Sequence, residues 1–230
     1  MNYEEAVSGL WRHHTLEDAA EDHKVLVRYA AMAPSSHNTQ PWKFSVEPGR
    51  VSILPDLTRR CPAVDPDDHH LYASLGCAAA NLEEAAAAAG LRAHQSFDDS
   101  LPGLVVDLEK GPAERSDLFE AIPSRQCTRT EYDGTAVSAD SLGMLEKAGT
   151  GDGVSVVLIT GEEKKGDVAE FVAEGNEAQI GDSAWVGELK EWIRFNEKEA
   201  VAAGDGLYAK AMGNPDVPAW LGKLFFRFAL

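Results

Sequence analysis

The chain has few of the residues that would tie it to a disulfide framework, a metal centre or a membrane. Its 230 residues include three cysteines, at positions 61, 77 and 127, and none stands in a CxxC or Cys/His spacing typical of zinc. No stretch approaches the roughly 20 apolar residues of a membrane-spanning helix. The acidic residues 1–22 contain no apolar core of signal-peptide length. We therefore expect a reduced, cytoplasmic protein with no metal and no membrane partner.

Basic residues are also scarce. Lysine and arginine total 21 against 38 aspartates and glutamates, which gives a net charge of -17. A nucleic-acid surface needs a basic stripe to neutralise phosphates, so no nucleic-acid partner is expected. The acidity is compatible with a solvated surface or with adaptation to high salt, and it indicates no chemistry by itself. A phosphate-bearing cofactor would need a local cluster of arginines to overcome the surrounding negative charge.

Common hydrolase and nucleotide-binding motifs are missing too. There is no Ser-His-Asp order, no Gly-x-Ser-x-Gly and no Walker-type phosphate loop. His69 and His70 follow three aspartates at positions 65, 67 and 68. Capping and solvation of a helix start explain this group better than a metal site.

Hydrophobic periodicity and turn residues predict a chain of mixed α and β structure. The predicted helices span residues 16–32, 69–89, 115–122, 162–180 and 183–203. The predicted strands span residues 43–46, 51–54, 91–97, 104–108 and 154–160. The first two strands flank a Pro-Gly turn and should form a hairpin. The β-branched run at 154–160 is the one we expect to be the most deeply buried strand.

Two of the predicted helices carry apolar faces. Residues 69–89 are rich in alanine, which favours a central buried helix with close neighbours, although an exposed helix selected for propensity would have the same composition. In residues 183–203, Trp185, Leu189, Trp192 and Ile193 are spaced as one core-facing stripe.

A polar loop is predicted where the first of these helices ends. Residues 33–42 read Ala-Pro-Ser-Ser-His-Asn-Thr-Gln-Pro-Trp, with prolines on both sides of a run of hydroxyl, carboxamide and imidazole groups. Proline restricts both its own backbone and that of the preceding residue, so the loop should hold a defined shape. It offers neutral donors and acceptors to a flat ligand, with Trp42 as a candidate wall. The same residues would also serve as ordinary helix-terminating punctuation.

Arg125 and Arg129 form the second notable group. They lie four residues apart, next to a predicted helix end, and each guanidinium can form two hydrogen bonds to phosphate oxygens. In so acidic a chain they could equally pair with nearby carboxylates.

These two segments resemble the cofactor site of a known family. Pro-Ser-Ser-x-Asn-x-Gln-Pro-Trp, at residues 34–42, is similar to the loop of flavin-dependent nitroreductases that lies against the FMN isoalloxazine and ribityl chain. Arg125, Cys127 and Arg129 resemble the segment that holds the FMN phosphate, with Cys127 where a hydroxyl residue is usual. A thiol is a weaker donor than a hydroxyl. The resemblance implies FMN as cofactor, with Pro34, Ser35, Ser36, Asn38, Gln40, Arg125, Cys127 and Arg129 as the binding residues.

The order of the segments resembles one branch of that family. In ordinary nitroreductases the arginines precede the loop, whereas here they follow it, as in the Acg-like branch, which looks like two domains fused in tandem. This likeness implies an α+β nitroreductase-like fold, a mostly antiparallel sheet flanked by helices, arranged as a pseudo-dimer. Residues 24–111 would form the first half and residues 112–230 a shortened second half, after an acidic segment at 1–23. The C-terminal part that Acg-like proteins carry beyond this point is absent from this sequence.

The resemblance also implies a function. The protein would transfer electrons from NAD(P)H through FMN to a small aromatic acceptor, a nitro or quinone compound, with no side chain acting as acid or base. It would work as a pseudo-dimeric monomer or as a homodimer. The alternative is a catalytically inactive flavin-binding or flavin-storage protein of the same fold, which the cysteine at 127 and the shortened second half favour.

Overall fold

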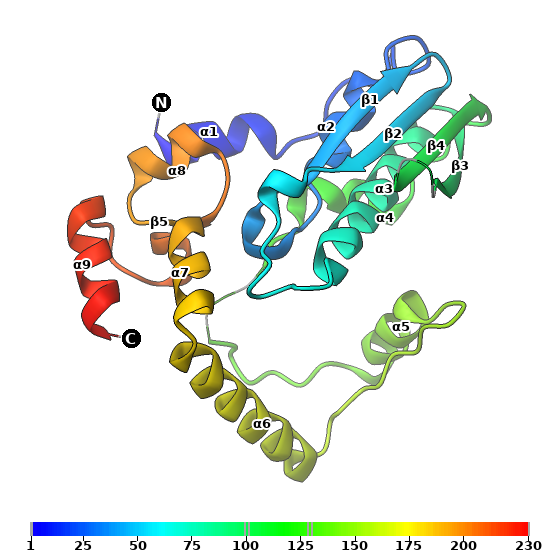
Figure 1. Cartoon of the computed structure of the whole chain (residues 1–230). Coiled ribbons are helices and arrows are strands. Elements are labelled where there is room, and N and C mark those ends of the chain that lie inside the picture. Colours follow the sequence, from blue (N-terminus) through cyan, green and yellow to red (C-terminus); the bar gives the residue numbers. More distant parts are fainter. Residues whose placement is uncertain (1, 99, 101, 128, 130, 230) are drawn as a thin grey trace.

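The computed structural model describes residues 2–98, 100, 102–127, 129 and 131–229 (Figure 1). Its α-helices are α1 Tyr3–Leu10, α2 Lys24–Ala30, α3 His69–Ala88, α4 Asp117–Ala121, α5 Ala139–Gly149, α6 Glu162–Gly181, α7 Ser183–Trp192, α8 Glu197–Ala203 and α9 Ala219–Ala229. Its strands are β1 Trp42–Glu47, β2 Arg50–Pro55, β3 Leu91–Asp98, β4 Gly103–Lys110, β5 Ile193–Arg194 and β6 Leu207–Tyr208. None of the described helices is long and apolar enough to cross a bilayer.

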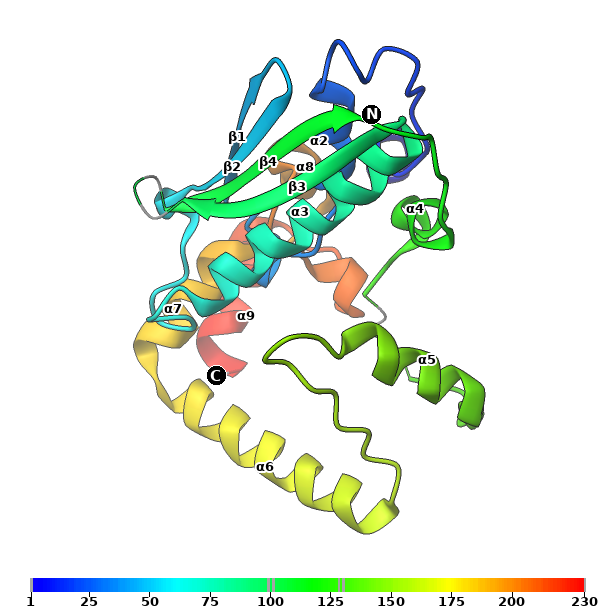
Figure 2. The same cartoon turned by 90° about the vertical axis from the view of Figure 1, so that its right-hand side faces the viewer.

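The main sheet has four antiparallel strands in the order β1-β2-β4-β3. β1 and β2 form the predicted hairpin, in which Glu47 pairs with Arg50. Gly49 in the turn has a φ of 71°, which glycine adopts without a steric penalty. α3 runs along one face of this sheet and α2 packs on α3 (Figure 2). The prediction of a mixed α and β fold with an antiparallel sheet is therefore confirmed.

The core lies between this sheet and α3. Leu75, Ala78, Ala79 and Leu82 of α3 are all fully buried, which confirms the prediction of a central helix. Their small side chains let α2 and the sheet approach the helix axis closely. Beside them the buried rings of Tyr29 and Phe119 lie 5.1 Å apart between centroids, which brings α4 onto the same core.

The first predicted helix is shorter than expected. Only Lys24–Ala30 of residues 16–32 is α-helical, and turns precede it. The buried His23 sits at the boundary, where its Nδ1 lies 2.7 Å from the Ala19 carbonyl and its Nε2 accepts from the Gly49 amide at 3.0 Å. These tertiary bonds hold the preceding turn in place, and no local pattern indicates them.

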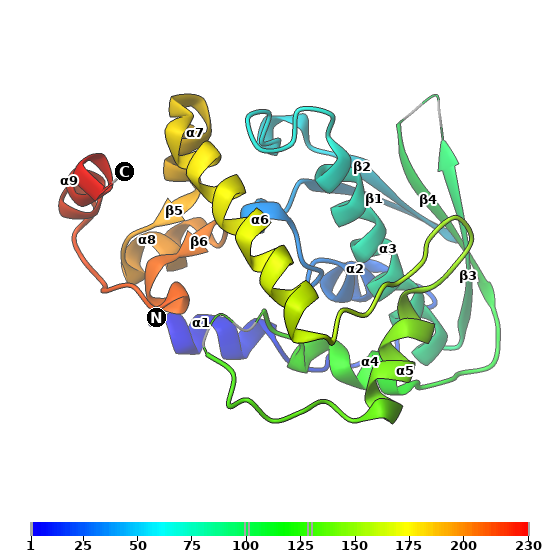
Figure 3. The same cartoon turned by 90° about the horizontal axis from the view of Figure 1, so that it is seen from below.

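The strand predicted at residues 154–160 is wrong. These residues form only an isolated bridge, between Gly151 and Val154, and Val157 is 78% exposed. A β-branched run becomes a strand only where a partner strand accepts its hydrogen bonds, and the described residues supply none here. The surrounding segment, 126–181, leaves the body of the molecule with α5 and α6 (Figure 1), so that α6 crosses in front of the other elements when seen from below (Figure 3). None of its described residues is buried.

The single helix predicted at residues 183–203 is also wrong. It divides into α7 and α8, because Ile193–Arg194 pairs in parallel with Leu207–Tyr208. Asn196 then caps α8, and its side chain accepts from the Glu199 amide. The expected core stripe on this stretch is only half-buried. The N-terminal helix α1, which the periodicity did not predict, lies beside α8, with the rings of Tyr3 and Tyr208 4.6 Å apart.

Candidate functional site

The loop that follows α2 has an unusual backbone. After a short 3₁₀ turn at Ser36–Asn38 it enters β1 at Trp42. His37, Asn38 and Gln40 have φ values of 48°, 53° and 51°. Such left-handed conformations cost about 1–3 kcal/mol each in residues other than glycine, although asparagine tolerates them better. Strain of this kind persists only where the surroundings impose it, and it is concentrated at functional sites.

Hydrogen bonds connect residues inside the loop. The Asn38 amide donates to the Ser35 carbonyl at 3.0 Å, and the Gln40 amide donates to the Ser35 hydroxyl at 2.9 Å. The Ser36 hydroxyl bonds to none of the described residues. Trp42, the candidate wall, is instead buried in the core 6.3 Å from the ring of Phe44, measured between centroids.

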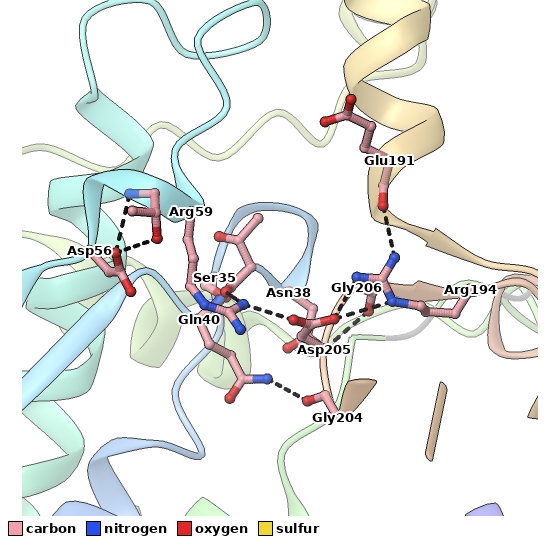
Figure 4. Close-up of polar contacts among 12 residues, drawn as sticks. Ser35, Asn38, Gln40, Asp56, Arg59, Glu191, Arg194, Gly204, Asp205 and Gly206 are labelled. Atoms are coloured by element: carbon pink, nitrogen blue, oxygen red, sulfur yellow. Dashed lines mark hydrogen bonds and ion pairs between the residues drawn. The ribbon is translucent and has the colours of Figure 1, made fainter. Parts of the chain in front are cut away.

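Residues 204–206, called the strap below, lie directly against this loop (Figure 4). The Asn38 side chain donates to the Gly206 carbonyl at 3.1 Å, and the Gly206 amide donates to the Asn38 carbonyl at 3.0 Å. The Gln40 side chain donates to the Gly204 carbonyl at 2.6 Å. The strap therefore already engages both carboxamides that the sequence assigned to flavin.

The strap is held by Asp205, whose carboxylate lies between two guanidiniums. Arg59 donates to it at 2.8 Å and Arg194 at 2.5 Å, and the Asp205 side chain is only 10% exposed. Burial raises the pKa of Asp205, but the hydrogen bonds from Arg194 and Arg59 outweigh burial and leave the pKa lowered. The carboxylate is therefore ionised at neutral pH and attracts both cations.

Both guanidiniums also lie near one indole. Arg59 and Arg194 are 6.0 and 5.8 Å from the centre of the Trp192 ring. Together with Thr58, Glu191 and Asp205 these side chains line an open depression of about 390 Å³. The sequence did not single out Asp205, Arg194 or the strap. The Gly-Asp-Gly triplet at 204–206 was the one available signal, because paired glycines mark a tight backbone turn.

A buried thiol contacts the imidazole of the loop. The Sγ atom of the buried Cys61 is 3.7 Å from Nδ1 of His37. Burial, together with the carboxylates of Glu188 and Asp65, raises the pKa of Cys61 to about 12, so it remains a thiol at neutral pH. Burial also lowers the pKa of His37, and the charge of Arg129 adds to this effect against that of Glu188.

Arg125 reaches the start of the same loop. Its Nη2 atom donates to the Met32 carbonyl at 3.1 Å, across 93 positions of sequence. The guanidinium stacks 5.4 Å from the centre of the Trp11 ring, and its Nη1 makes a 3.6 Å contact with the Cys127 sulfur. Its Nε is buried with no hydrogen-bond partner among the described residues. The structure thus brings the predicted phosphate arginine to within two residues of Pro34.

The remaining predicted site residues are more exposed. Cys127 and Arg129 both lie on the surface. Arg129 is close enough to the loop for its charge to affect His37. No group of three or more His, Cys, Asp or Glu side chains that could hold a metal occurs among the residues described.

Some of the hydrogen-bonding groups described at this site are free to bind FMN. Arg125 has an orphaned N–H and a weak sulfur partner, as expected of a guanidinium that could take a stronger acceptor such as a phosphate oxygen. Ser36 has a spare hydroxyl. Asn38 and Gln40 each retain a carbonyl oxygen and a second N–H, because each uses one side-chain N–H on the strap.

Comparison with known proteins points in the same direction. No family model matches the chain. It is 27% identical over 182 residues to the Mycobacterium tuberculosis protein (strain H37Rv) named "Putative NAD(P)H nitroreductase Rv3131", a match that covers 75% of this chain and 51% of that protein. It is 25% identical over 229 residues to the "Probable NAD(P)H nitroreductase PigM" of a Serratia strain, covering 94% of this chain and 61% of PigM. The chain thus spans about half to three-fifths of the length of these relatives. It is similar to proteins named as NAD(P)H nitroreductases.

Proposed function

We propose that this protein is an FMN-dependent oxidoreductase that transfers electrons from NAD(P)H to nitro or quinone compounds. The observation that carries the proposal is the bond from Arg125 to the Met32 carbonyl. It joins the two segments on which the resemblance rests, although they are far apart in sequence. The names of the similar proteins support the same class of reaction.

In this proposal the chain binds and orients the cofactor. Pro34, Ser35, Ser36, Asn38 and Gln40 would hold the ring and ribityl chain. FMN, when bound, supplies the electron transfer between the nicotinamide and the acceptor.

The phosphate would lie at the other segment. Arg125 and Arg129 would pair with its oxygens, and Cys127 would lie beside them as a weak donor. No side chain is assigned a catalytic acid or base role. The division into halves at 24–111 and 112–230, with a monomeric pseudo-dimer or a homodimer as the working form, belongs to the same proposal.

A second candidate function is flavin binding or storage without turnover. Two observations favour it: the strap already uses one N–H of both Asn38 and Gln40, and a thiol stands at position 127. Both would weaken the hold on flavin relative to a site with free amides and a hydroxyl.

Spectroscopy separates the two. The purified protein is incubated with excess FMN and desalted, and its visible flavin band is then followed under anaerobic conditions while NADH or NADPH is added. A retained band that bleaches supports the oxidoreductase, and a retained band that does not bleach supports storage. A protein that retains no flavin would contradict both.

The phosphate assignment has its own test. Arg125→Ala combined with Arg129→Ala should abolish FMN retention, because both cations of the pair are lost. Arg115→Ala is a matched control, since Arg115 also stacks on an aromatic ring, Phe119 at 4.9 Å, and pairs with Glu120 at 2.8 Å. Unchanged flavin content in the double variant, or equal loss in the control, would refute the assignment.

A further inference from the structure

The loop at 35–40 cannot hold its own shape by internal bonds alone. Three of its residues, His37, Asn38 and Gln40, have left-handed φ values and none is glycine. Backbone in this region returns to more favoured conformations unless outside contacts prevent it. The source of those contacts therefore decides whether a binding loop exists at all.

The outside hydrogen bonds to Asn38 and Gln40 come from the strap, 168 and 164 positions later in the chain. It binds two of the three left-handed residues, Asn38 through backbone and side chain and Gln40 through its side chain. Gly204 and Gly206 themselves have φ values of 65° and 77°, which suit glycine. The strap therefore adopts its backbone conformation with little strain, whereas the loop needs the contacts with the strap to keep its own.

Asp205 connects the strap to the loop a second time. Arg59 uses one nitrogen, Nη1, to donate both to Asp205 at 2.8 Å and to the carbonyl of Thr39 at 2.7 Å. Thr39 is itself 1% exposed and lies between two of the left-handed residues. Arg194 holds the same carboxylate from the other side, at 2.5 Å. The carboxylate thus stands at the centre of a chain of contacts that runs from β5 to the middle of the loop.

We propose that Asp205 is a positioning residue: through Arg59 and the strap it fastens the 35–40 loop in its left-handed conformation and so sets the affinity of that loop for flavin. The flavin part rests on the function proposed above. Asp205 touches no reacting atom and acts only through the loop.

An ion pair on the exposed surface would not fasten the loop in this way. Exposed pairs contribute little, because water and salt screen them. Asp205 is nearly buried and the Arg194 side chain is only 16% exposed, so loss of the carboxylate leaves the Arg194 cation poorly solvated and takes the ion-pair partner from the half-buried Arg59. Arg59 would then lose the ion pair that fixes it on the Thr39 carbonyl, while its contact with the Trp192 ring would remain.

The experiment compares Asp205→Asn with Asp107→Asn. The control removes a carboxylate of the same size that pairs with Arg50 at 2.7 Å on the surface, far from the loop in sequence. Two quantities are measured: the Kd for FMN, and the hydrogen exchange of the backbone amides of Asn38, Thr39 and Gln40 relative to amides of α3. Asp205→Asn should raise the Kd about tenfold, equivalent to about 1.4 kcal/mol, and should accelerate exchange in the loop only. Asp107→Asn should change neither.

A double-variant cycle tests the route through Arg59. Arg59→Gln should raise the Kd by a similar factor, and the Arg59→Gln, Asp205→Asn pair should be little worse than either single variant. If the double variant raises the Kd by the product of the two single factors, the two residues act separately and the mechanism is overturned. If Asp205→Asn does not fold, Arg59→Lys takes its place, because an ammonium keeps the charge but cannot reproduce the planar guanidinium geometry.

The outcomes separate this inference from the proposed function. Unchanged loop exchange and unchanged Kd in Asp205→Asn would sink the positioning role while the wild-type protein still binds FMN. A wild-type protein that binds no FMN would sink the proposed function and the affinity part of the inference. Loop exchange would still show whether Asp205 fastens the loop.

Discussion

Gly206→Ala should destabilise this protein much more than Gly204→Ala, although both glycines belong to the strap. Both have left-handed backbones, with φ values of 77° and 65°. For an alanine, that conformation costs about 1–2 kcal/mol at either position. A Cβ at Gly204 would meet nothing within 4 Å. A Cβ at Gly206 would collide with the carbonyl oxygen of Trp192 and lie 2.9 Å from Cζ of Arg194.

The collision adds a second contribution at Gly206 only. Overpacking of a well-fitted site costs typically about 1–3 kcal/mol, and here the obstacle is backbone, which cannot rotate away. We therefore expect a loss of about 1–2 kcal/mol for Gly204→Ala and about 2–5 kcal/mol for Gly206→Ala. Urea unfolding, followed by tryptophan fluorescence, measures the free energy of unfolding of both variants. Equal m-values would show that differences in midpoint reflect differences in stability. Equal destabilisation of the two variants would refute the packing of the strap on Trp192 and Arg194.

Two further predictions concern ionisable groups. Burial raises the pKa of Asp65, but hydrogen bonds from the backbone amides of His70 and Leu71 outweigh it and leave the pKa lowered. A lowered carboxyl pKa stabilises the folded state above its unfolded value of about 3.9, and this stabilisation is lost as pH falls through the folded value. Asp65→Asn should therefore lower the urea midpoint at neutral pH, and its midpoint should fall less steeply than that of the wild type as pH is lowered. Parallel curves of midpoint against pH for the two proteins would contradict this. For the cysteines, the exposed Cys127 should react with a maleimide in the native protein, whereas Cys61, buried and with its pKa raised to about 12, should react only after unfolding. Mass spectrometry of labelled peptides decides, and native labelling of Cys61 would show that its pocket opens.

The sequence pattern predicted an element correctly where its conformation depends on residues close together in the chain. The hairpin of β1 and β2 follows from alternating residues around a Pro-Gly turn, and the alanine-rich helix follows from its length and its small side chains. The hairpin supplies two of the four strands of the main sheet and the helix covers that sheet, so both line the hydrophobic core.

Pattern failed where pairing decides the conformation. Residues 154–160 have strand-forming side chains and no strand partner among the described residues, and none of them is buried. Residues 183–203 have helical periodicity, yet β5 interrupts them because Ile193–Arg194 pairs with Leu207–Tyr208. A partner elsewhere in the chain, present or missing, outweighs the local preference in both cases.

The candidate site divides in the same way. Residue type drew attention to the loop and to Arg125 and Arg129, because hydroxyls, carboxamides and guanidiniums can bind a polar, phosphorylated ligand. Their assignment to a flavin came from the resemblance to nitroreductases and stays a prediction. The orientation of Arg125 was not predicted, since its bond to Met32 depends on tertiary packing, in which the ring of Phe119 from α4 meets that of Tyr29 from α2.

The sequence by itself determined the hairpin, the buried helix and the chemical character of the loop after α2, because each depends on residues close together in the chain. Only the tertiary structure decided what holds that loop. Asp205 and Arg194 carry no local signal of their role, and the glycines of the strap signal only a tight turn. They act because folding places the strap against residues 38–40 and the two arginines around Asp205. A backbone strained in three places needs contacts from outside itself, and those contacts lie beyond the reach of any local pattern.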